Sequence, residues 1–463
     1  MRLYNTLTKT ETEVQFPTKG TFNMFVCGPT VYDEPHLGNA RVYLFFDTLV
    51  RYLRSQGKKI YYLQNITDID DKIITRAREE STTTKAIAQR YLRVYQKNMR
   101  SLGVISVNRY ALATKYVKDI KRQVETLIAK GHAYKIENDG WYFDLKTFSD
   151  YGQLAGRTVE QAEDGTSRID ASDQKRNRGD FCLWKFKRDG EPSWRANFGD
   201  GRPGWHIEDT AISEHHFGSQ YDLHGGGADL IFPHHEAEIA QQESASGKKP
   251  FVHNWMHIGL VNVDGKKMSK SLGNFITISD FLKKNSAQAL RLLFLQHDYR
   301  QTVNLTAESL ADAEKTLNKV KNFFQKLDFV SDRAQKTSSP EPKTINQNFV
   351  EEFRNQLENG FRTPSALASV FTVINSYETI IWKLSASEAG DIKKILTDRL
   401  AWLGFQIKSE KIPRHVKRIA TRRDALRAHQ QFMHSDALRK QLEELGYTVE
   451  DTPLGTFVSK ATG

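Results

Sequence analysis

The 463-residue sequence contains only two cysteines, Cys27 and Cys182, which is too few for a disulfide framework and favours a reducing compartment. It has no run of about 18 apolar residues, and no apolar leader precedes the strand expected at 22–26, so we expect neither a membrane span nor a secretory signal. No internal repeat of about 20 to 50 residues is visible. These absences predict a cytoplasmic protein that does not associate with membranes.

The composition is that of an ordinary globular protein, with 39% hydrophobic residues, 27% charged residues and 12 prolines. The length suggests two to four domains. Lys and Arg number 67 against 56 Asp and Glu, which gives a net charge of +11 and modestly favours anionic partners such as nucleotides or nucleic acid.

The hydrophobic pattern predicts an α/β chain. A buried strand at 22–26, a helix at about 39–55 and a second strand at 60–66 form a βαβ unit. Strands return near 221–223 and 257–263, around a helix expected at 233–243. We therefore predict a Rossmann-type parallel sheet that is split by an insertion.

The two other regions differ from this α/β pattern. Residues from about 120 to 205 show short mixed elements, with a hairpin near 138–143 and a polar run at 164–180. Beyond residue 276 the apolar spacing is helical almost throughout, apart from a solvated linker expected at 331–343. The predicted fold class is therefore an α/β catalytic domain followed by an all-helical C-terminal half.

The first motif, CGPTVYDEPHLGNAR, runs from Cys27 to Arg41 and crosses from the end of a strand into a helix. A helix N-terminus carries unpaired N–H groups that suit a phosphate, and Gly38 allows a flat ring to approach the backbone. Alone, a histidine such as His36 near a helix start is more often a cap or a surface residue.

The second motif, GKKMSKSLGN, places Lys267 and Lys270 on a loop bounded by glycines after the last predicted strand. Two lysines there can follow a polyphosphate whose charge grows as its bond to a leaving pyrophosphate breaks. The alternative is a solvated lysine loop. The pairing of this motif with the first one, in the two halves of one α/β chain, favours the catalytic interpretation.

Together these motifs resemble those of class I aminoacyl-tRNA synthetases and, within that class, those of the cysteinyl-tRNA synthetase family. The resemblance covers nearly the whole chain in the same order, through 65–73 (NITDIDDKI), 202–208 (RPGWHIE), 224–241 (HGGGADLIFPHHEAEIAQ), 265–274 (GKKMSKSLGN) and 450–456 (EDTPLGT). It implies ATP-dependent activation of L-cysteine to cysteinyl adenylate, with Mg²⁺, and transfer to the 3′ end of tRNA(Cys).

The resemblance also implies a division of the chain and several nucleotide contacts. His36, Asn39, Lys267 and Lys270 would be catalytic, and Gly38 and Asp229 would join them in binding ATP. Asn39 stands where the family motif ends in histidine, so a changed rate is expected rather than a loss of activity. The implied regions are the two halves of the Rossmann domain at 1–120 and 205–275, a connective insertion at 121–204, a stem-contact region at 276–330, a helical bundle at 331–404 and an anticodon-binding domain at 405–463.

A metal site is suggested by His234 and Glu238, which at i and i+4 share one face of the expected helix, and by Cys27 at the end of a buried strand. As bare residues these are more often a surface hydrogen bond and a small core residue. By resemblance they hold one zinc ion per chain that binds the substrate thiolate. At the fourth position the family has cysteine and this sequence has Asp209.

We expect Asp209 to complete the zinc site, since a carboxylate oxygen is an accepted zinc ligand. The departure leaves two other outcomes open: a weaker or different metal, or the activation of another amino acid. By resemblance, Gly28, Thr30, Thr67 and Trp205 contact the amino acid, with Trp205 near the thiol. Cys182 is expected to be an ordinary buried residue.

Two other functions compete with tRNA charging. A cysteine ligase of the same family would pass the activated cysteine to a small amine, but it would need no anticodon reader, and about 190 residues follow Ser271 in this chain. A non-catalytic RNA-binding relative would be expected to lose the lysines of the second motif, which are present. The expected partners are tRNA(Cys), L-cysteine and ATP, and a monomer is expected.

Overall fold

The computed structural model describes the chain except for residues 158–160, 162–171, 270–271, 335–340 and 462–463. Lys270 and part of the polar run at 164–180 therefore lie outside the described residues. The chain divides into two compact units, one of Met1–Ala287 with Tyr299–Leu305 and one of Gln288–Asp298 with Thr306–Gly463.

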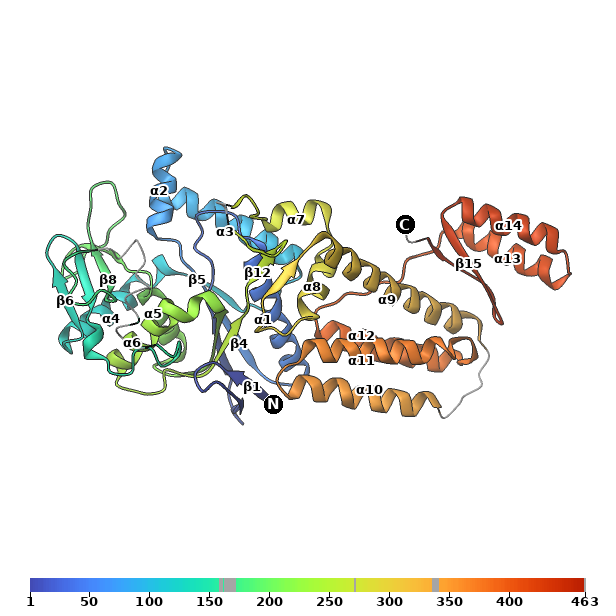
Figure 1. Ribbon diagram of the computed structural model, residues 1–463, viewed down its shortest axis with the longest axis horizontal. Helices are drawn as coiled ribbons and strands as arrows, with labels where there is room; N and C mark the ends of the chain where they lie inside the picture. The colour runs from blue at the N-terminus through green and yellow to red at the C-terminus, as the bar shows by residue number, and fades with distance from the viewer. Residues whose placement is uncertain (158–160, 162–171, 270–271, 335–340, 462–463) are drawn as a thin grey trace. The chain divides into compact units, whose positions relative to one another are not determined.

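A five-stranded parallel sheet of order β11-β10-β3-β4-β5 forms the centre of the first unit (Figure 1). Met24, Phe25 and Val26 in β3 are fully buried, as expected of a strand covered on both faces. The strand order reverses beside β3, and ligands bind at such a point outside the carboxyl ends of the strands. The strands are β3 (Phe22–Val26), β4 (Ile60–Ile66), β5 (Arg109–Leu112), β10 (Tyr221–Gly227) and β11 (Val252–Ile258).

Helix α1 (Leu37–Ser55) links β3 to β4, which confirms the predicted βαβ unit. Gly57, which follows the helix, has φ +76°, a conformation that glycine adopts without strain. The other helices of this unit are α2 (Asp71–Glu79), α3 (Thr84–Ser101), α4 (Val117–Ala129), α5 (Ile207–Phe217), α6 (Glu236–Ser246) and α7 (Ile278–Lys284), and a hairpin of β1 (Arg2–Asn5) and β2 (Thr10–Glu13) precedes the sheet.

A separate antiparallel sheet of order β6-β7-β8-β9 occupies the region where the insertion is expected. Its strands are β6 (Ala133–Ile136), β7 (Gly140–Phe143), β8 (Phe181–Phe186) and β9 (Gly201–Pro203). The predicted hairpin is confirmed, with Asn138 at φ +60° in the turn. Cys182 packs in β8 against Tyr134, Ile136 and Tyr142, so it is the ordinary buried residue that the sequence predicted.

The strand expected at 257–263 is wrong in its bounds, because the run is two strands in two sheets. β11 ends at Ile258, and β12 (Val261–Val263) pairs with β13 (Lys266–Lys267) and β14 (Val303–Leu305). Between them the buried guanidinium of Arg41 donates to the carbonyl oxygens of Gly259 and Leu260 at 2.8 and 2.7 Å. The apolar run does not reveal this break, since its cause is a side chain far away in sequence.

The helix expected at 233–243 is interrupted only before its start. Phe232 is extended (φ −138°, ψ 133°) and forms a kink, and the backbone is helical again at His235 and through α6, which ends at Ser246. The proline that suggested a helix start therefore directly follows the kink.

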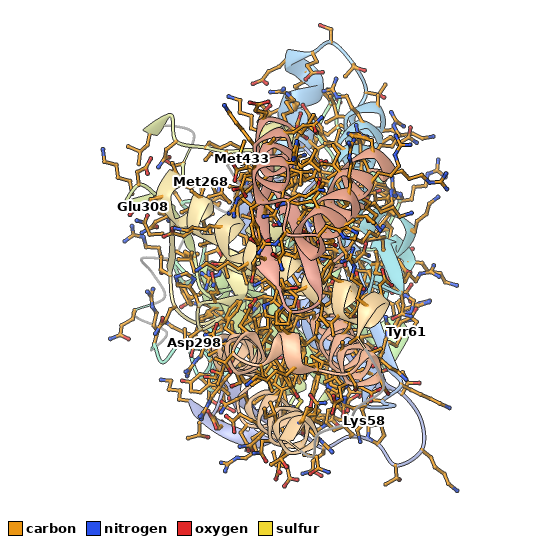
Figure 2. All side chains as sticks on the ribbon, turned by 90° about the vertical axis from the view of Figure 1, so that its right-hand side faces the viewer. Lys58, Tyr61, Met268, Asp298, Glu308 and Met433 are labelled. Atoms are coloured by element: carbon orange, nitrogen blue, oxygen red, sulfur yellow. The ribbon has the colours of Figure 1, made fainter. Side chains whose placement is uncertain are left out.

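The second unit is helical as predicted up to α14, but the prediction that it is all-helical is wrong at its end, where β15 and β16 form an antiparallel hairpin. The predicted linker at 331–343 is shorter than expected, because α9 continues to Arg333 and α10 begins at Glu341. The strongly exposed Met433 lies on α14 (Figure 2). The elements are α8 (Ala287–Leu295), α9 (Ala307–Arg333), α10 (Glu341–Glu358), α11 (Thr363–Glu378), α12 (Ala386–Trp402), α13 (Arg414–Ala428), α14 (Phe432–Glu444), β15 (Tyr447–Thr452) and β16 (Gly455–Lys460).

Candidate active site and metal centre

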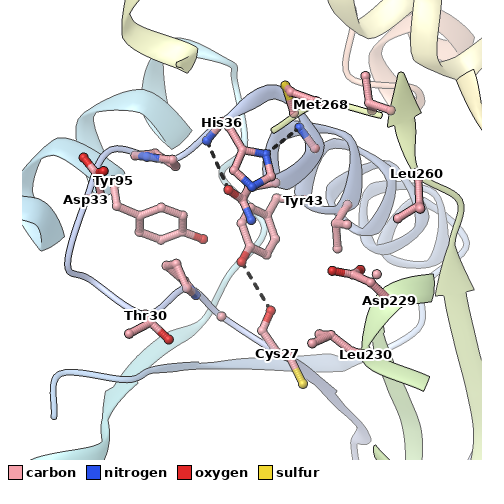
Figure 3. Close-up of a pocket in the computed structure, with 18 of the residues that line it drawn as sticks. Cys27, Thr30, Asp33, His36, Tyr43, Tyr95, Asp229, Leu230, Leu260 and Met268 are labelled. Carbon is pink, nitrogen blue, oxygen red and sulfur yellow. Dashed lines mark hydrogen bonds between the residues drawn. The ribbon is translucent and has the colours of Figure 1, made fainter. Parts of the chain in front are cut away.

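A cavity of about 360 Å³ opens at the carboxyl ends of the central strands (Figure 3). Its walls come from the segment after β3, the start of α1, the segment after β10 and the loop after β12. The structure thus brings together predicted residues that are more than 200 positions apart in the sequence. Those that line the cavity are Cys27, Gly28, Thr30, His36, Gly38, Asn39, Asp229 and Lys267.

His36 caps the N-terminus of α1. Its Nδ1 accepts a hydrogen bond from Gly38 N at 3.0 Å, and the backbone N of His36 donates to Asn39 Oδ1 at 3.1 Å. Because Nδ1 accepts, the proton of the neutral ring is on Nε2. A Cβ on Gly38 would lie 2.8 Å from His36 Cε1, so glycine is required for this arrangement. The cap interpretation of His36 is thus confirmed, and its catalytic role stays a prediction.

Asn274 holds the loop of the second motif in place. Its Nδ2 donates to the carbonyl oxygen of Lys267 at 3.2 Å, and its Oδ1 accepts from Ser269 N at 2.9 Å. Lys267 lies in β13 and lines the cavity. One lysine of the predicted pair is thus placed at the cavity, and the other, Lys270, is outside the described residues.

The four predicted metal ligands meet in a buried cluster below the cavity. Cys27 Sγ lies 3.4 Å from Asp209 Oδ2 and 3.9 Å from Glu238 Oε1. His234 Nε2 lies 3.1 Å from each of the same two oxygens. Cys27 belongs to both sites, because it also lines the cavity.

These separations fit a tetrahedral zinc site. Zinc bonds of about 2.0 to 2.3 Å at tetrahedral angles place neighbouring ligand atoms about 3.3 to 3.6 Å apart. Among the described residues, the ion-pair partners of the buried Asp209 and Glu238 are all histidines, and Glu238 Oε2 has no hydrogen-bond partner. Buried carboxylates of this kind need a compensating cation. The donor set therefore fits zinc.

Burial raises the pKa of the Cys27 thiol, and the carboxylates of Glu238 and Asp209 raise it further. Burial also raises the pKa of Glu238, with Asp209 adding to the effect. Without a cation, this cluster thus favours protonated side chains. A bound metal ion reverses that preference, because it selects the deprotonated ligands.

Further histidines surround the cluster, and the sequence analysis did not assign them. His235 Nε2 lies 3.1 Å and His224 Nε2 3.2 Å from Cys27 Sγ. Ligand atoms of Cys27, His234, His235 and Glu238 all lie within 4.8 Å of one another. His235 and His224 are buried, and burial and neighbouring histidines lower the pKa of both, so both rings are neutral.

The position of His235 directly after His234 explains why it escaped notice. In a regular helix two consecutive side chains point about 100° apart, so His234 and His235 are not expected to face one site. Their side chains both reach the cluster from the turn before α6. The doubled histidine in the sequence was the available signal.

The residues expected to contact the amino acid flank this cluster. Trp205 stacks on the ring of His234, with centroids 4.3 Å apart and planes at 21°. Thr67 forms a parallel bridge with Thr30 across the ends of β4 and β3. Thr67 and Trp205 do not line the cavity itself, whereas Gly28 and Thr30 do.

Comparison with known proteins places these features in a family. Residues 13–315 match the family model described as tRNA synthetases class I (C) catalytic domain. The fold resembles that of Mycobacterium tuberculosis methionyl-tRNA synthetase in complex with methionyl-adenylate, with TM-score 0.62 and 15% identity over 83% of this chain and 90% of that one. The fold and the site are those of a class I aminoacyl-tRNA synthetase.

Two curated relatives narrow the family. Cysteine–tRNA ligase of Thermoplasma volcanium is 40% identical over 452 residues, which cover 97% of this chain and 98% of the relative. The same enzyme of Thermoplasma acidophilum is 41% identical over 456 residues, covering 97% and 98%. The chain belongs to the cysteine–tRNA ligase family. None of its described helices is long and apolar enough to cross a membrane.

Proposed function

We propose that this chain activates L-cysteine with ATP and transfers the cysteinyl group to the 3′ end of tRNA(Cys), with zinc recognition of the thiol. The observation that carries the proposal is the double position of Cys27, which lines the cavity and contributes to the metal cluster. An amino acid whose carboxylate faces His36 therefore has its side chain directed at a metal centre. The predicted cytoplasmic location and monomeric state stay predictions.

In the first step, a carboxylate oxygen of cysteine attacks the α-phosphorus of ATP, and the bond from that phosphorus to pyrophosphate breaks. His36 donates from Nε2 to a phosphate oxygen, and Lys267 and Lys270 neutralise the charge that grows on the leaving pyrophosphate. Asp229, which lines the same cavity, supplies a carboxylate for the ribose hydroxyls. In the second step, a ribose hydroxyl at the tRNA 3′ end attacks the acyl carbon and AMP leaves.

Zinc would be held by Cys27, Asp209, His234 and Glu238, and when bound it supplies a Lewis acid that takes the substrate sulfur as thiolate. We favour Asp209 over His235 as the fourth ligand on two grounds. Asp209 Oδ2 lies 3.1 Å from His234 Nε2, whereas His235 Nε2 lies 4.0 Å from Glu238 Oε1. Asp209 also stands at the position where the family motif has its fourth ligand, a cysteine.

The near-complete length match with cysteine–tRNA ligases favours tRNA over a small amine acceptor. The basic segment 408–440 would contact the RNA. This segment carries ten Lys or Arg residues against three Asp or Glu. Arg423 is one of the ten, but it does not face solvent, because it is buried and paired with Asp451. The remaining exposed cations are Lys408, Lys411, Arg414, Lys417, Arg418, Arg422 and Lys440.

ATP–pyrophosphate exchange with each of the twenty amino acids tests the activation step. Exchange should depend on cysteine and be lost when Lys270 is replaced by alanine. Lys266→Ala is the matched control, since Lys266 lies in β13 and does not line the cavity. Exchange driven best by serine, or unchanged in Lys270→Ala, would refute the proposal.

A further inference from the structure

Asn65, near the end of β4, joins three residues of the candidate site. Its Nδ2 donates to Asp209 Oδ1 at 2.5 Å and to Thr67 Oγ1 at 3.4 Å. Its Oδ1 accepts from the backbone N of Gly28 at 2.5 Å. The side chain is buried, with the residue 2% exposed. In the sequence, Asn65 stood out only as the first residue of the segment 65–73, which resembles the family motif.

These partners fix the orientation of the amide. A backbone N–H can only donate, so the group that faces Gly28 must be the amide oxygen. The carboxylate of Asp209 accepts, so the group that faces it must be the NH₂. A flipped amide would place its NH₂ against the N–H of Gly28 and its oxygen against the carboxylate of Asp209. Asparagine thus satisfies both partners in one orientation only.

We propose that Asn65 is a positioning residue that holds Asp209 as a ligand through one oxygen. An aspartate carries two oxygens where the family's cysteine carries one sulfur. Oδ2 of Asp209 faces Cys27 and His234, so Oδ1 needs a hydrogen-bond donor inside the protein. In the part of the chain that the structure describes, the only side-chain donor to Oδ1 is Asn65.

The same amide connects the metal cluster to the amino-acid pocket. Gly28 lines the cavity, and Thr67 forms the bridge with Thr30 next to it. A Cβ on Gly28 would lie 1.7 Å from the backbone oxygen of Asn65, so the two strand ends are in close contact. Rotation of Asp209 would therefore disturb the segment that faces the substrate, and Asn65 prevents it.

This inference rests on the proposed zinc site, and the test separates the two. Zinc affinity of the full-length holoprotein is measured by chelator competition, together with kcat and KM for cysteine in pyrophosphate exchange. Asn65→Ala removes the amide, and Asn65→Asp keeps its shape and the acceptor for Gly28 but loses the donor. Asn254→Ala is the matched control, because Asn254 is also buried in the central sheet, where its Nδ2 donates to the carbonyl of Asp222 at 2.9 Å.

Both Asn65 variants should bind zinc about 10 to 100-fold more weakly, the usual loss for a group that supports a metal ligand. KM for cysteine should rise with little change in kcat. In an Asp209→Cys background, Asn65→Ala should change zinc affinity less than about threefold, since a thiolate has no second oxygen to hold. The Asn254→Ala variant should bind zinc like the unchanged protein.

Equal losses of zinc affinity for Asn65→Ala in the two backgrounds would show a merely structural role and overturn the inference. The inference alone also fails if Asp209→Ala weakens zinc binding and neither Asn65 variant does. If Asp209→Ala itself binds zinc normally, the proposed metal site fails instead.

Discussion

Replacing Asp209 by alanine is the sharpest test of how this chain departs from its family. The substitution removes one of the four proposed donors. Asp209 Oδ2 lies 3.4 Å from Cys27 Sγ and 3.1 Å from His234 Nε2, which is close to the spacing of ligand atoms in a tetrahedral site. Loss of a supporting group costs about 10 to 100-fold in metal affinity. A direct ligand should cost at least the upper end of that range, about 100-fold or about 2.7 kcal/mol.

The assay is zinc affinity by chelator competition, with zinc content by elemental analysis and cysteine-dependent exchange on the same samples. Asp209→Ala should lose zinc and activity together. Asp209→Cys should keep both, because thiolate is the family's own ligand. His235→Ala is the matched comparison, since its Nε2 lies 3.1 Å from Cys27 Sγ and yet is not assigned as a ligand. It should cost less than Asp209→Ala.

The reverse order would refute this assignment. If His235→Ala lost its zinc while Asp209→Ala kept a full complement and full activity, the ligands would be Cys27, His234, His235 and Glu238. Those four offer mutually close atoms, so the alternative is a definite one.

Three other predictions follow from the site and the fold. His36→Ala should lower kcat for exchange by about 10² to 10³-fold with little change in KM for cysteine, because the ring acts on charge that develops at the phosphates. His253, which is exposed on β11, is the control, and an equal loss of kcat in His253→Ala would contradict this role. Deleting residues 405–463 should abolish most tRNA charging and its steep salt dependence while exchange continues. Unchanged charging by the folded remainder would contradict the RNA-binding assignment. Burial, with His215 and Arg109, lowers the pKa of His216 to about 4, whereas an unfolded histidine titrates near about 6.5. As the pH falls, the unfolded state therefore binds the proton first, and the free energy of unfolding in urea should decrease between about pH 6.5 and about pH 4. His216→Gln should make this decrease smaller. The same pH dependence in the variant and the unchanged protein would refute the prediction.

The sequence predicted the central elements well because their signals are local. The buried strands at 22–26 and 60–66 are continuous apolar runs, and the helix between them has a clear apolar spacing and a glycine after its end. Residues of both motifs line one cavity, as their pairing suggested, although the second motif follows β12 of a separate sheet.

The features that the sequence missed depend on contacts between distant residues. The break after Ile258 lies where Arg41 binds two backbone carbonyl oxygens, and His235 reaches the cluster although it directly follows His234. The hairpin of β15 and β16 follows a long helical region. Its strands are short and alternate with a period of two residues, which the helical spacing before them does not predict. Asn65 looks like any polar residue at a strand end until Asp209 is placed beside it.

If Asp209 is the fourth ligand, as proposed, a carboxylate in place of the family's thiolate should still allow recognition of cysteine. A carboxylate donates less electron density than a thiolate, so a zinc ion held by the proposed donor set would be more electron-poor, and we expect it to bind the substrate thiolate at least as well. Serine differs from cysteine by one atom, and an apolar pocket separates such pairs by only about 100-fold. Its hydroxyl is a harder and far less acidic group than a thiol, so it competes poorly for the metal at neutral pH. Discrimination then occurs in the first binding step, provided that Asp209 is held to one oxygen, and Asn65 is placed to do this.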